Sequence, residues 1–304
     1  MKPLNWFSIL ALTLVALCSN APTGLCQDTK VAPSKTAPKQ AIDDVDSAPE
    51  FLRVTKEGKK LQSMQTAVVT YSDPNKPNSP KVTLIGAVHI AESEYYSRLN
   101  TIFKGYDALL FEMVMNPSDG IPDPKQRGVS PVSTIQVGMK DALGLTFQLD
   151  EVDYKAKNFV HADMTPDEFF KSMKRRNEGV MQILFRSIGA GIAMQSKGKS
   201  SDVGMLMAAV GDDPQKGLRR AMAEQMVEMD GQMAGLSGDD GKSTLITERN
   251  AKAFEVLNEQ IRKGKKNLGI FYGAGHLKDM HERLTEEYGM KPEKVEYLDA
   301  WSLK

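Results

Sequence analysis

The chain has few of the residues on which disulfide-rich folds and several common enzyme sites depend. Its 304 residues include only two cysteines, Cys18 and Cys26, and four histidines. A chain cleaved after Cys26 has no disulfide, no cysteine-bound metal and no thiol nucleophile. The HExxH pattern of zinc proteases and the GxSxG pattern of serine hydrolases are both absent. Any histidine chemistry must therefore use His89, His161, His276 or His281.

The chain also lacks a net charge, since Lys and Arg together number 39 and so do Asp and Glu. Binding of nucleic acid generally needs a basic surface, so this balance excludes a general nucleic-acid partner. Two glycine-containing stretches, 273–278 and 236–243, resemble parts of nucleotide-binding loops. They have Lys278 and Leu236 where such loops need glycine. We therefore expect the protein to bind neither nucleic acid nor a nucleotide.

Residues 1–49 are expected to lie outside the folded domain. Lys2 precedes an apolar run from Trp6 to Cys18, which as a helix reaches about 20 Å, short of the ~30 Å of a bilayer core. We interpret residues 1–26 as a signal peptide for export to the periplasm or beyond. Residues 27–49 are rich in Pro, Ala, Ser and charge, as in a flexible linker. An uncleaved signal segment is the alternative, and the only membrane contact that we expect.

Residues 50–304 are long enough to form a core of their own and alternate between strand and helix patterns. Apolar strand patterns occur at 64–71, 81–88, 107–114, 268–272 and 295–301, and helical spacing occurs at 92–103, 246–261 and 277–287. A strand, a helix and a second strand within 81–114 indicate a βαβ unit with parallel strands. The sequence therefore predicts a mixed α/β domain in which helices flank a central mixed β-sheet.

The middle of this domain, residues 164–243, has a different composition. Ten methionines lie between Met164 and Met233. Thr165, Pro166 and Glu168 form a strong helix start, with a capping residue, a proline at the first position and a glutamate at the third. We expect a helical insertion or subdomain. Its methionines either fill an adaptable core or belong to a mobile cover over a site for an apolar substrate.

Three polar residues lie where the pattern predicts buried strands. His89 follows strand 81–88, Glu112 lies inside strand 107–114, and His276 follows strand 268–272. An unpaired buried carboxylate costs several kcal/mol, so Glu112 needs a partner or a cavity. Sites in open α/β sheets gather at the carboxyl ends of parallel strands, where both histidines are expected. Gly86 and Gly273 begin the two GxxH turns. Glycine lets the backbone turn tightly or lets a ligand approach the backbone closely.

Two histidines and one carboxylate, with a position left open, are a ligand set used by catalytic metals. The sequence therefore predicts that His89, Glu112 and His276 bind a divalent cation. Arg249, on a helix that leads to the second GxxH turn, is expected to bind a carboxylate or an oxyanion there. An ordinary surface or salt-bridged arginine is the alternative. His161, which follows the apolar pair 159–160, is a further candidate for the same edge.

Four motifs in this order resemble the TraB/GumN/TIKI family: GAVH (86–89), LLFEM (109–113), ERNAKAFEVL (248–257) and GIFYGAGH (269–276). The resemblance covers most of residues 64–302. The family is marked by two GxxH motifs, a glutamate after the first and an arginine before the second. Here these are Gly86 with His89, Glu112, Arg249, and Gly273 with His276. Ala87 is a departure, because many members have threonine at that position.

The resemblance implies a fold similar to that of erythromycin-esterase-like and ChaN-like proteins. It also implies an exported metal-dependent hydrolase, since TIKI members are proteases that act outside the membrane and favour manganese or cobalt. We expect a peptidase that uses Mn, Co or Zn and acts on a peptide or a protein. The cation lowers the pKa of its bound water and polarises the scissile carbonyl.

Some roles stay open at this level. Glu112 is either a metal ligand or the general base, and Glu248 is a second candidate for proton transfer. Arg249 either stabilises the oxyanion or holds a carboxylate of the substrate. The alternative function is a non-catalytic extracytoplasmic protein that binds a peptide or a haem-like ligand. A family member whose polar cluster is only structural is the third possibility.

Overall fold

The computed structural model describes residues 48–121, 142–178, 213–230 and 241–304. The predicted signal peptide (1–26) and nearly all of the predicted linker (27–49) lie outside these ranges, as do 179–212 and 231–240 of the methionine-rich middle. Among the helices of the described ranges, none combines the length and the hydropathy that a membrane crossing needs.

The described residues form a seven-stranded mixed β-sheet, as the alternating pattern predicted. Its strands are β1 (Leu52–Glu57), β2 (Lys60–Ser72), β3 (Lys81–Ala87), β5 (Ala108–Phe111), β7 (Phe159–His161), β8 (Asn267–Gly273) and β9 (Lys291–Ser302). They run in the order β1-β2-β3-β8-β5-β7, and β9 also pairs with β2. Strands β3, β8, β5 and β7 are parallel, whereas β2 is antiparallel to β1, β3 and β9. A separate two-stranded sheet joins β4 (Ile90–Ala91) to β6 (Thr146–Phe147).

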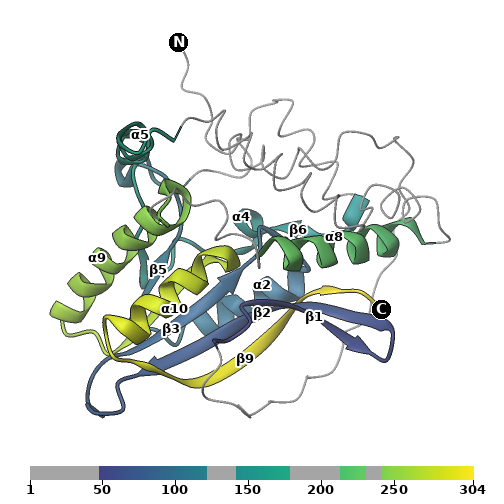
Figure 1. Ribbon diagram of the computed structural model, residues 1–304, viewed down its shortest axis with the longest axis horizontal. Helices are drawn as coiled ribbons and strands as arrows, with labels where there is room; N and C mark the ends of the chain where they lie inside the picture. The colour runs from purple at the N-terminus through teal and green to yellow at the C-terminus, as the bar shows by residue number, and fades with distance from the viewer. Residues whose placement is uncertain (1–47, 122–141, 179–212, 231–240) are drawn as a thin grey trace.

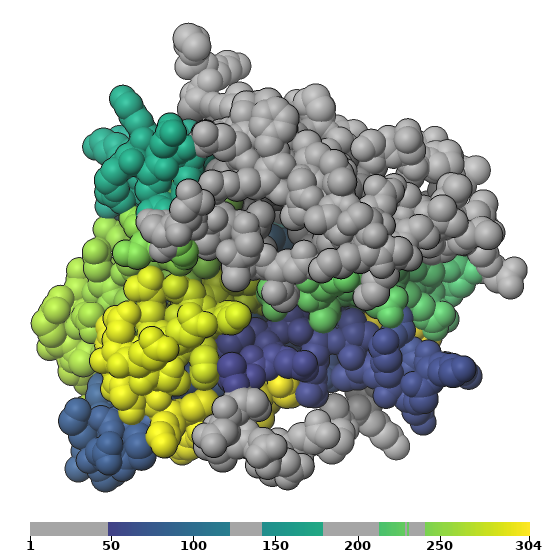
Figure 2. Space-filling view, viewed as in Figure 1, coloured from purple at the N-terminus to yellow at the C-terminus, as the bar shows by residue number. Residues whose placement is uncertain are grey.

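The helices flank the sheet on both faces (Figure 1). They are α2 (Ser93–Phe103), α4 (Gln148–Glu151), α5 (Pro166–Arg175), α8 (Pro214–Asp230), α9 (Arg249–Arg262) and α10 (Leu277–Glu286), with the short turns η1 (Pro117–Asp119), η4 (Thr244–Glu248) and η5 (Ala274–His276). Buried residues of α2 and α8 pack on one face, and buried residues of α9 and α10 pack on the other. In Figure 2, α9 (light green) and α10 (yellow) form one continuous surface.

Side-chain alternation along β5 decides which face each residue meets. Leu109 and Phe111 pack with the α2 cluster, whereas Ala108 and Leu110 pack with the α9 and α10 cluster. Because successive strand residues point to opposite faces, the next residue, Glu112, is directed to the side of α9 and α10. Arg249 of α9 donates a hydrogen bond to Glu112 on that side.

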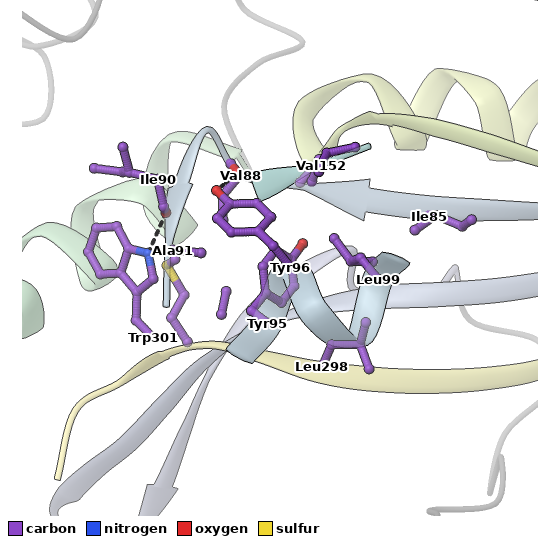
Figure 3. Packing of buried hydrophobic residues seen from close by; sticks show 14 of the residues in the cluster. Ile85, Val88, Ile90, Ala91, Tyr95, Tyr96, Leu99, Val152, Leu298 and Trp301 are labelled. Carbon is purple, nitrogen blue, oxygen red and sulfur yellow. Dashed lines mark hydrogen bonds between the residues drawn. The ribbon is translucent and has the colours of Figure 1, made fainter. Parts of the chain in front are cut away.

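Buried aromatic residues hold the segment that follows β3. The hydroxyl of Tyr95 donates to the carbonyl of Gly86, and that of Tyr96 donates to the carbonyl of Val88, each over 2.9 Å. The indole of Trp301 donates to the carbonyl of Ile90 over 2.7 Å (Figure 3). These bonds hold three backbone carbonyls between the end of β3 and the start of β4, so the chain on both sides of His89 is fixed.

Helix α5 begins as the sequence predicted. The amide of Glu168 donates to the hydroxyl oxygen of Thr165 over 3.2 Å, and the amide of Thr165 donates to the carboxylate of Glu168 over 2.8 Å. This reciprocal pair is a complete capping box. Figure 1 shows α5 beside the N-terminal end of α9, where it contacts the π-helical turn η4.

Two predicted boundaries are wrong. The strand predicted at 107–114 ends at Phe111, so Glu112 lies directly after β5 and not inside it. β5 leaves the ladder two residues before β8 ends, and the amide of Gly273 in β8 donates instead to the side-chain carboxylate of Glu112. The helix predicted from 246 begins instead with the π-helical turn η4, and regular α-helix starts only at Arg249.

Candidate functional site

Three polar segments meet at one edge of the sheet because three parallel strands end there in register. Ala87 at the end of β3 pairs with Gly273 at the end of β8. Phe111 at the end of β5 pairs with Phe271, also in β8. The residues that follow these strand ends include His89, Glu112 and His276. The parallel direction of β3 and β5 that the βαβ pattern predicted is confirmed, with β8 between them.

Glu112 lies at the centre of this edge, with its side chain 11% exposed. Its Oε1 accepts a hydrogen bond from Arg249 Nη2 over 2.7 Å, and its Oε2 accepts one from the amide of Gly273 over 2.7 Å. The Nε2 of His276 lies 3.6 Å from Oε1. The buried carboxylate therefore has the partners that its burial requires.

Gly273 is needed for space and not for its backbone angles. Its φ is −51°, which any residue adopts. A Cβ at this position would lie 3.3 Å from Oε2 of Glu112. The glycine of the second GxxH turn therefore lets the carboxylate reach the backbone amide.

Arg249 is buried and so is not a surface arginine, but it forms salt bridges to Asp163 and Glu112, as the alternative interpretation expected. Its Nε and Nη2 donate to the two carboxylate oxygens of Asp163, over 2.9 and 2.6 Å, and Nη2 also donates to Glu112. Its Nη1 makes only long contacts, 3.4 Å to His276 Nε2 and 3.5 Å to the carbonyl of Leu245. A π-helical turn, Thr244–Glu248, directly precedes Arg249. Such turns are frequent next to functional sites.

The sequence interpretation missed Asp163. This residue is buried and follows β7 by two positions. Its carboxylate also accepts from the amide of Met164 over 2.7 Å. The rule that selected His89 and His276, a polar residue just after a buried strand, applies equally to Asp163, so the signal was present in the sequence.

The second missed residue, Asn250, contacts His276. Its Oδ1 lies 2.7 Å from Nδ1 of His276, while its Nδ2 donates to the carbonyl of His276 over 3.0 Å and to Asp279 over 2.8 Å. Since an amide oxygen only accepts, Nδ1 carries the proton and Nε2 presents a lone pair. Burial also lowers the pKa of His276 to about 4, so the ring is neutral at pH 7.

The electrostatics of the cluster keep Glu112 ionised. Burial alone raises the pKa of a carboxyl group, but the charge of Arg249, followed by the two histidines and the Gly273 amide, outweighs it and holds the pKa well below its ordinary value. The neighbouring carboxylates of Asp163 and Glu112 in turn raise the pKa of Arg249, against the effect of its burial. A carboxylate with so low a pKa is a poor general base, which favours the ligand role of Glu112 over the base role.

His89 lies at this edge but stands apart from the buried cluster. Its side chain is exposed, and its positive form lowers the pKa of Glu112, so the two residues are within electrostatic reach. The amide of Gln148 donates to its backbone carbonyl over 2.9 Å. Across the described ranges, no three His, Cys, Asp or Glu side chains gather closely enough to hold one metal ion.

The other two sequence candidates lie outside the cluster. Glu248 binds Arg175 of α5 over 2.5 Å, and its side chain is 24% exposed. His161 packs its ring against Phe111 and donates from Nε2 to the carbonyl of Met113 over 2.6 Å. His161 therefore lies at the same edge of the sheet, where it supports the backbone just after Glu112.

Two of the three predicted ligands, Glu112 and His276, have the chemistry of a metal site. Two ligand atoms that bind a tetrahedral metal at about 2.1 Å each are about 3.4 Å apart. The separation between Glu112 Oε1 and His276 Nε2 is 3.6 Å. One atom belongs to an ionised carboxylate and the other to a neutral imidazole, so the donor pair fits a divalent cation in distance and in protonation state.

No protein-family model, curated protein or solved structure matches this chain. The resemblance to the TraB/GumN/TIKI family therefore depends on the four sequence motifs. The polar groups that those motifs supply, Glu112, Arg249 and His276, lie in mutual contact at one edge of the sheet.

Proposed function

We propose that the protein is an exported metal-dependent hydrolase of the TraB/GumN/TIKI type, and specifically a peptidase. The observation that carries this proposal is the contact between Glu112 Oε1 and His276 Nε2, 3.6 Å apart, beside the buried guanidinium of Arg249. A carboxylate and an imidazole nitrogen are ligands that Mn, Co and Zn all accept. Their place at the carboxyl ends of parallel strands is typical of active sites in α/β sheets.

The protonation states support cation binding. A metal ion requires its carboxylate ligand to be ionised and its histidine ligand to be neutral. The lowered pKa values of Glu112 and His276 provide both states at pH 7. Neither ligand would release a proton on binding, so affinity is not reduced by that cost.

The charge balance of the cluster points the same way. The carboxylates of Glu112 and Asp163 contribute two negative charges, and the single guanidinium of Arg249 contributes one positive charge. With His276 neutral, the buried cluster carries a net charge of −1. An unbalanced buried charge is unfavourable, so a cation at Glu112 and His276 would be attracted to this edge.

His89 is the third ligand of the proposed site. Its side chain is exposed at the same edge, and among the hydrogen bonds of the described residues none holds its ring. The flanking backbone is anchored by Tyr96 and Trp301. The backbone beside His89 is therefore held, and a movement of its ring toward Glu112 would be a rotation of the side chain.

The weakly engaged donor of Arg249, Nη1, suits the reaction. Its Nε and Nη2 are committed to Asp163 and Glu112, but its Nη1 has only the contacts of 3.4 and 3.5 Å. We assign Nη1 to the oxygen on which negative charge develops during peptide hydrolysis. A divalent cation, when bound, supplies an activated water at neutral pH and polarises the scissile carbonyl.

Metal content tests this proposal directly. The full chain and its Glu112→Gln and His276→Gln variants would be purified without chelator and measured by elemental mass spectrometry. Glu255→Gln is the matched control, because Glu255 lies on α9 with a side chain that is 70% exposed. We expect about one Mn, Co or Zn per chain in the wild type and the control, and loss of metal in the other two variants.

A peptide-pool digestion with the same four proteins tests the activity. Hydrolysis that follows metal content supports the peptidase. A wild type that takes up none of the three cations contradicts the proposal, as does Glu112→Gln with full metal and full activity. A Soret band without hydrolysis would instead identify a haem-binding protein.

A further inference from the structure

We infer that Asn250 is a positioning residue that selects the tautomer of His276. Its side-chain oxygen keeps the proton on Nδ1, and this leaves a lone pair on Nε2, which lies 3.4 Å from the Arg249 Nη1 donor and 3.6 Å from Oε1 of Glu112. The tautomer assignment stands on the hydrogen bonds alone. Its consequence for metal binding rests on the proposed function, so the two are tested separately.

The hydrogen bonds of the amide fix which of its ends faces the ring. Asn250 is fully buried in the first turn of α9. Its Nδ2 has two acceptors, the carbonyl of His276 at 3.0 Å and Oδ2 of Asp279 at 2.8 Å. Reversing the amide would place an oxygen against two other oxygens, so Oδ1 must be the atom that faces Nδ1 of His276, 2.7 Å away.

A second layer holds the amide in this orientation. Arg283 Nε donates to Oδ2 of Asp279 over 2.7 Å, and Arg283 Nη2 donates to the carbonyl of Thr247 over 3.1 Å. This chain of bonds runs from α10 back to the π-helical turn and ends one residue before Glu248. Asp279 therefore accepts from both Arg283 and Asn250, and Asn250 has one stable arrangement.

The Nε2–H tautomer of His276 also has an acceptor within reach, so the Nδ1–H form has to be favoured over it. A proton on Nε2 would have Oε1 of Glu112 as an acceptor 3.6 Å away, although it would also face the Nη1 donor of Arg249 at 3.4 Å. That tautomer would remove the lone pair from the metal-facing side of the ring. Asn250 disfavours it, because a bare Nδ1 would then face the amide oxygen with no hydrogen between them.

A purely structural asparagine would not need this contact. The two bonds from Nδ2 already join α9 to the start of α10. The bond from Oδ1 to the ring adds control over His276 itself, of the kind by which an outer partner orients a histidine ligand. Removing this acceptor should therefore change the state of the ring and not only the stability of the fold.

The tautomer is measured in the metal-free full chain with ¹⁵N-labelled histidine. Two-bond proton–nitrogen correlation spectra show which ring nitrogen carries hydrogen, and His276→Gln identifies the signals of His276 among the four histidines. We expect the Nδ1–H form in the wild type and a shift toward the Nε2–H form in Asn250→Leu. A wild-type ring in the Nε2–H form overturns the inference without any variant, and so does Asn250→Leu with an unchanged ring.

An acceptor-retaining variant and a control separate positioning from stability. In Asn250→Asp, one carboxylate oxygen still accepts from Nδ1, so the Nδ1–H form should remain. The other oxygen faces the carbonyl of His276 and Asp279, so the stability should fall. Asn258→Leu removes one bond on the same helix, from Tyr288 over 3.0 Å, and should leave the ring unchanged. Loss of the Nδ1–H form in Asn250→Asp contradicts the inference.

Manganese titration of the same proteins tests the functional consequence. We expect Asn250→Leu to bind Mn²⁺ about 10- to 100-fold more weakly than the wild type, and Asn258→Leu to match the wild type. If Asn250→Leu shifts the tautomer but leaves the Mn²⁺ affinity unchanged, the inference that Asn250 selects the tautomer stands and the ligand role of His276 is refuted. If the wild type shows the Nδ1–H form and binds no metal, the proposed function fails and the tautomer selection stands.

Discussion

Asp163 binds Arg249 through two hydrogen bonds, Nε to Oδ1 over 2.9 Å and Nη2 to Oδ2 over 2.6 Å. The second hydrogen of the same Nη2 goes to Oε1 of Glu112 over 2.7 Å. The guanidinium is thus held by one carboxylate and shared with another. This arrangement turns Nη1, the only nitrogen with spare capacity, toward His276.

Replacing Asp163 with asparagine should release Arg249. The change keeps the size of the side chain but leaves a buried guanidinium with one carboxylate partner in place of two. We expect a loss of stability of about 3 kcal/mol, at the lower end of what breaking a buried ion pair costs, since Glu112 remains. Urea unfolding measures it.

Asp299→Asn is the matched control for that measurement. Asp299 accepts one hydrogen bond, from Gln65 over 2.7 Å, at a half-buried position in β9. Its substitution should cost less than about 1 kcal/mol. Equal losses of unfolding free energy in the two variants would mean that the Asp163–Arg249 pair stabilises the fold no more than an ordinary half-buried hydrogen bond does.

The two motif glycines should respond differently to alanine. A Cβ on Gly273 meets Oε2 of Glu112 at 3.3 Å, so we expect roughly tenfold weaker metal binding with little change in stability. A Cβ on Gly86 meets the carbonyl of Ala67 at 3.2 Å and Cδ1 of Leu277 at 3.3 Å. Gly86→Ala should therefore lose about 1–3 kcal/mol through overpacking between strands.

Urea unfolding and metal titration of both glycine variants test this contrast. The contrast fails if Gly273→Ala binds metal as tightly as the wild type, or if Gly86→Ala is fully stable. A large stability loss in Gly273→Ala would show that the carboxylate cannot move by the few tenths of an ångström that the methyl group demands.

The buried neutral His276 should make the metal-free protein sensitive to mild acid. Its folded pKa is about 4, against 6.5 for an ordinary histidine, so the unfolded chain takes up a proton at pH values where the folded chain does not. Stability is therefore complete above about pH 6.5 and falls as the pH drops toward 4, by roughly 1–3 kcal/mol in total. The contribution of Glu112, whose pKa is lowered, is lost only below about pH 4.5.

Chemical unfolding between pH 7 and 5, with chelator present, tests this prediction. Burial also lowers the pKa of His281, which binds Tyr71 on the far side of α10, so the wild-type slope contains both residues. The difference between the wild type and His276→Gln isolates His276. Identical slopes would show that the ring of His276 is not held neutral by the fold.

The sequence predicted the local elements well because their signals are local. The apolar run that became β8 and the spacing that became α2 and α10 depend on neighbouring residues, as does the capping box at Thr165. The position of β8 between β3 and β5 was not predicted. Strand order depends on pairing between distant segments, which no periodicity within a strand encodes.

The same limit applies to the site. Three of its groups, Glu112, Arg249 and His276, stand out in the sequence because a polar residue interrupts or follows an apolar run, or because a motif marks it. Asn250 was missed because only its partner, 26 residues away along the chain, identifies it. Asp163 was missed although it follows an apolar strand, and its partner Arg249 lies 86 residues away along the chain. Glu248 looked equivalent to its neighbour Arg249, but one step along a helix turns a side chain by ~100°, and Glu248 meets Arg175 instead.

Arg249→Lys separates the two roles that the sequence left open for this arginine. Lysine keeps the positive charge, so the net charge of the cluster and its attraction for a cation are preserved. It cannot contact Asp163 and Glu112 while also presenting a third donor, because it lacks the planar fork of nitrogens. If Nη1 stabilises the developing oxyanion, kcat falls about 10²- to 10³-fold with metal content unchanged. If Nη1 holds a carboxylate of the substrate, KM rises instead and kcat changes little.

Arg262→Lys, in the last turn of α9, is the control and should match the wild type in both constants. An Arg249→Lys enzyme with wild-type kcat and KM would exclude both roles and leave Arg249 as the structural centre of the buried charge cluster.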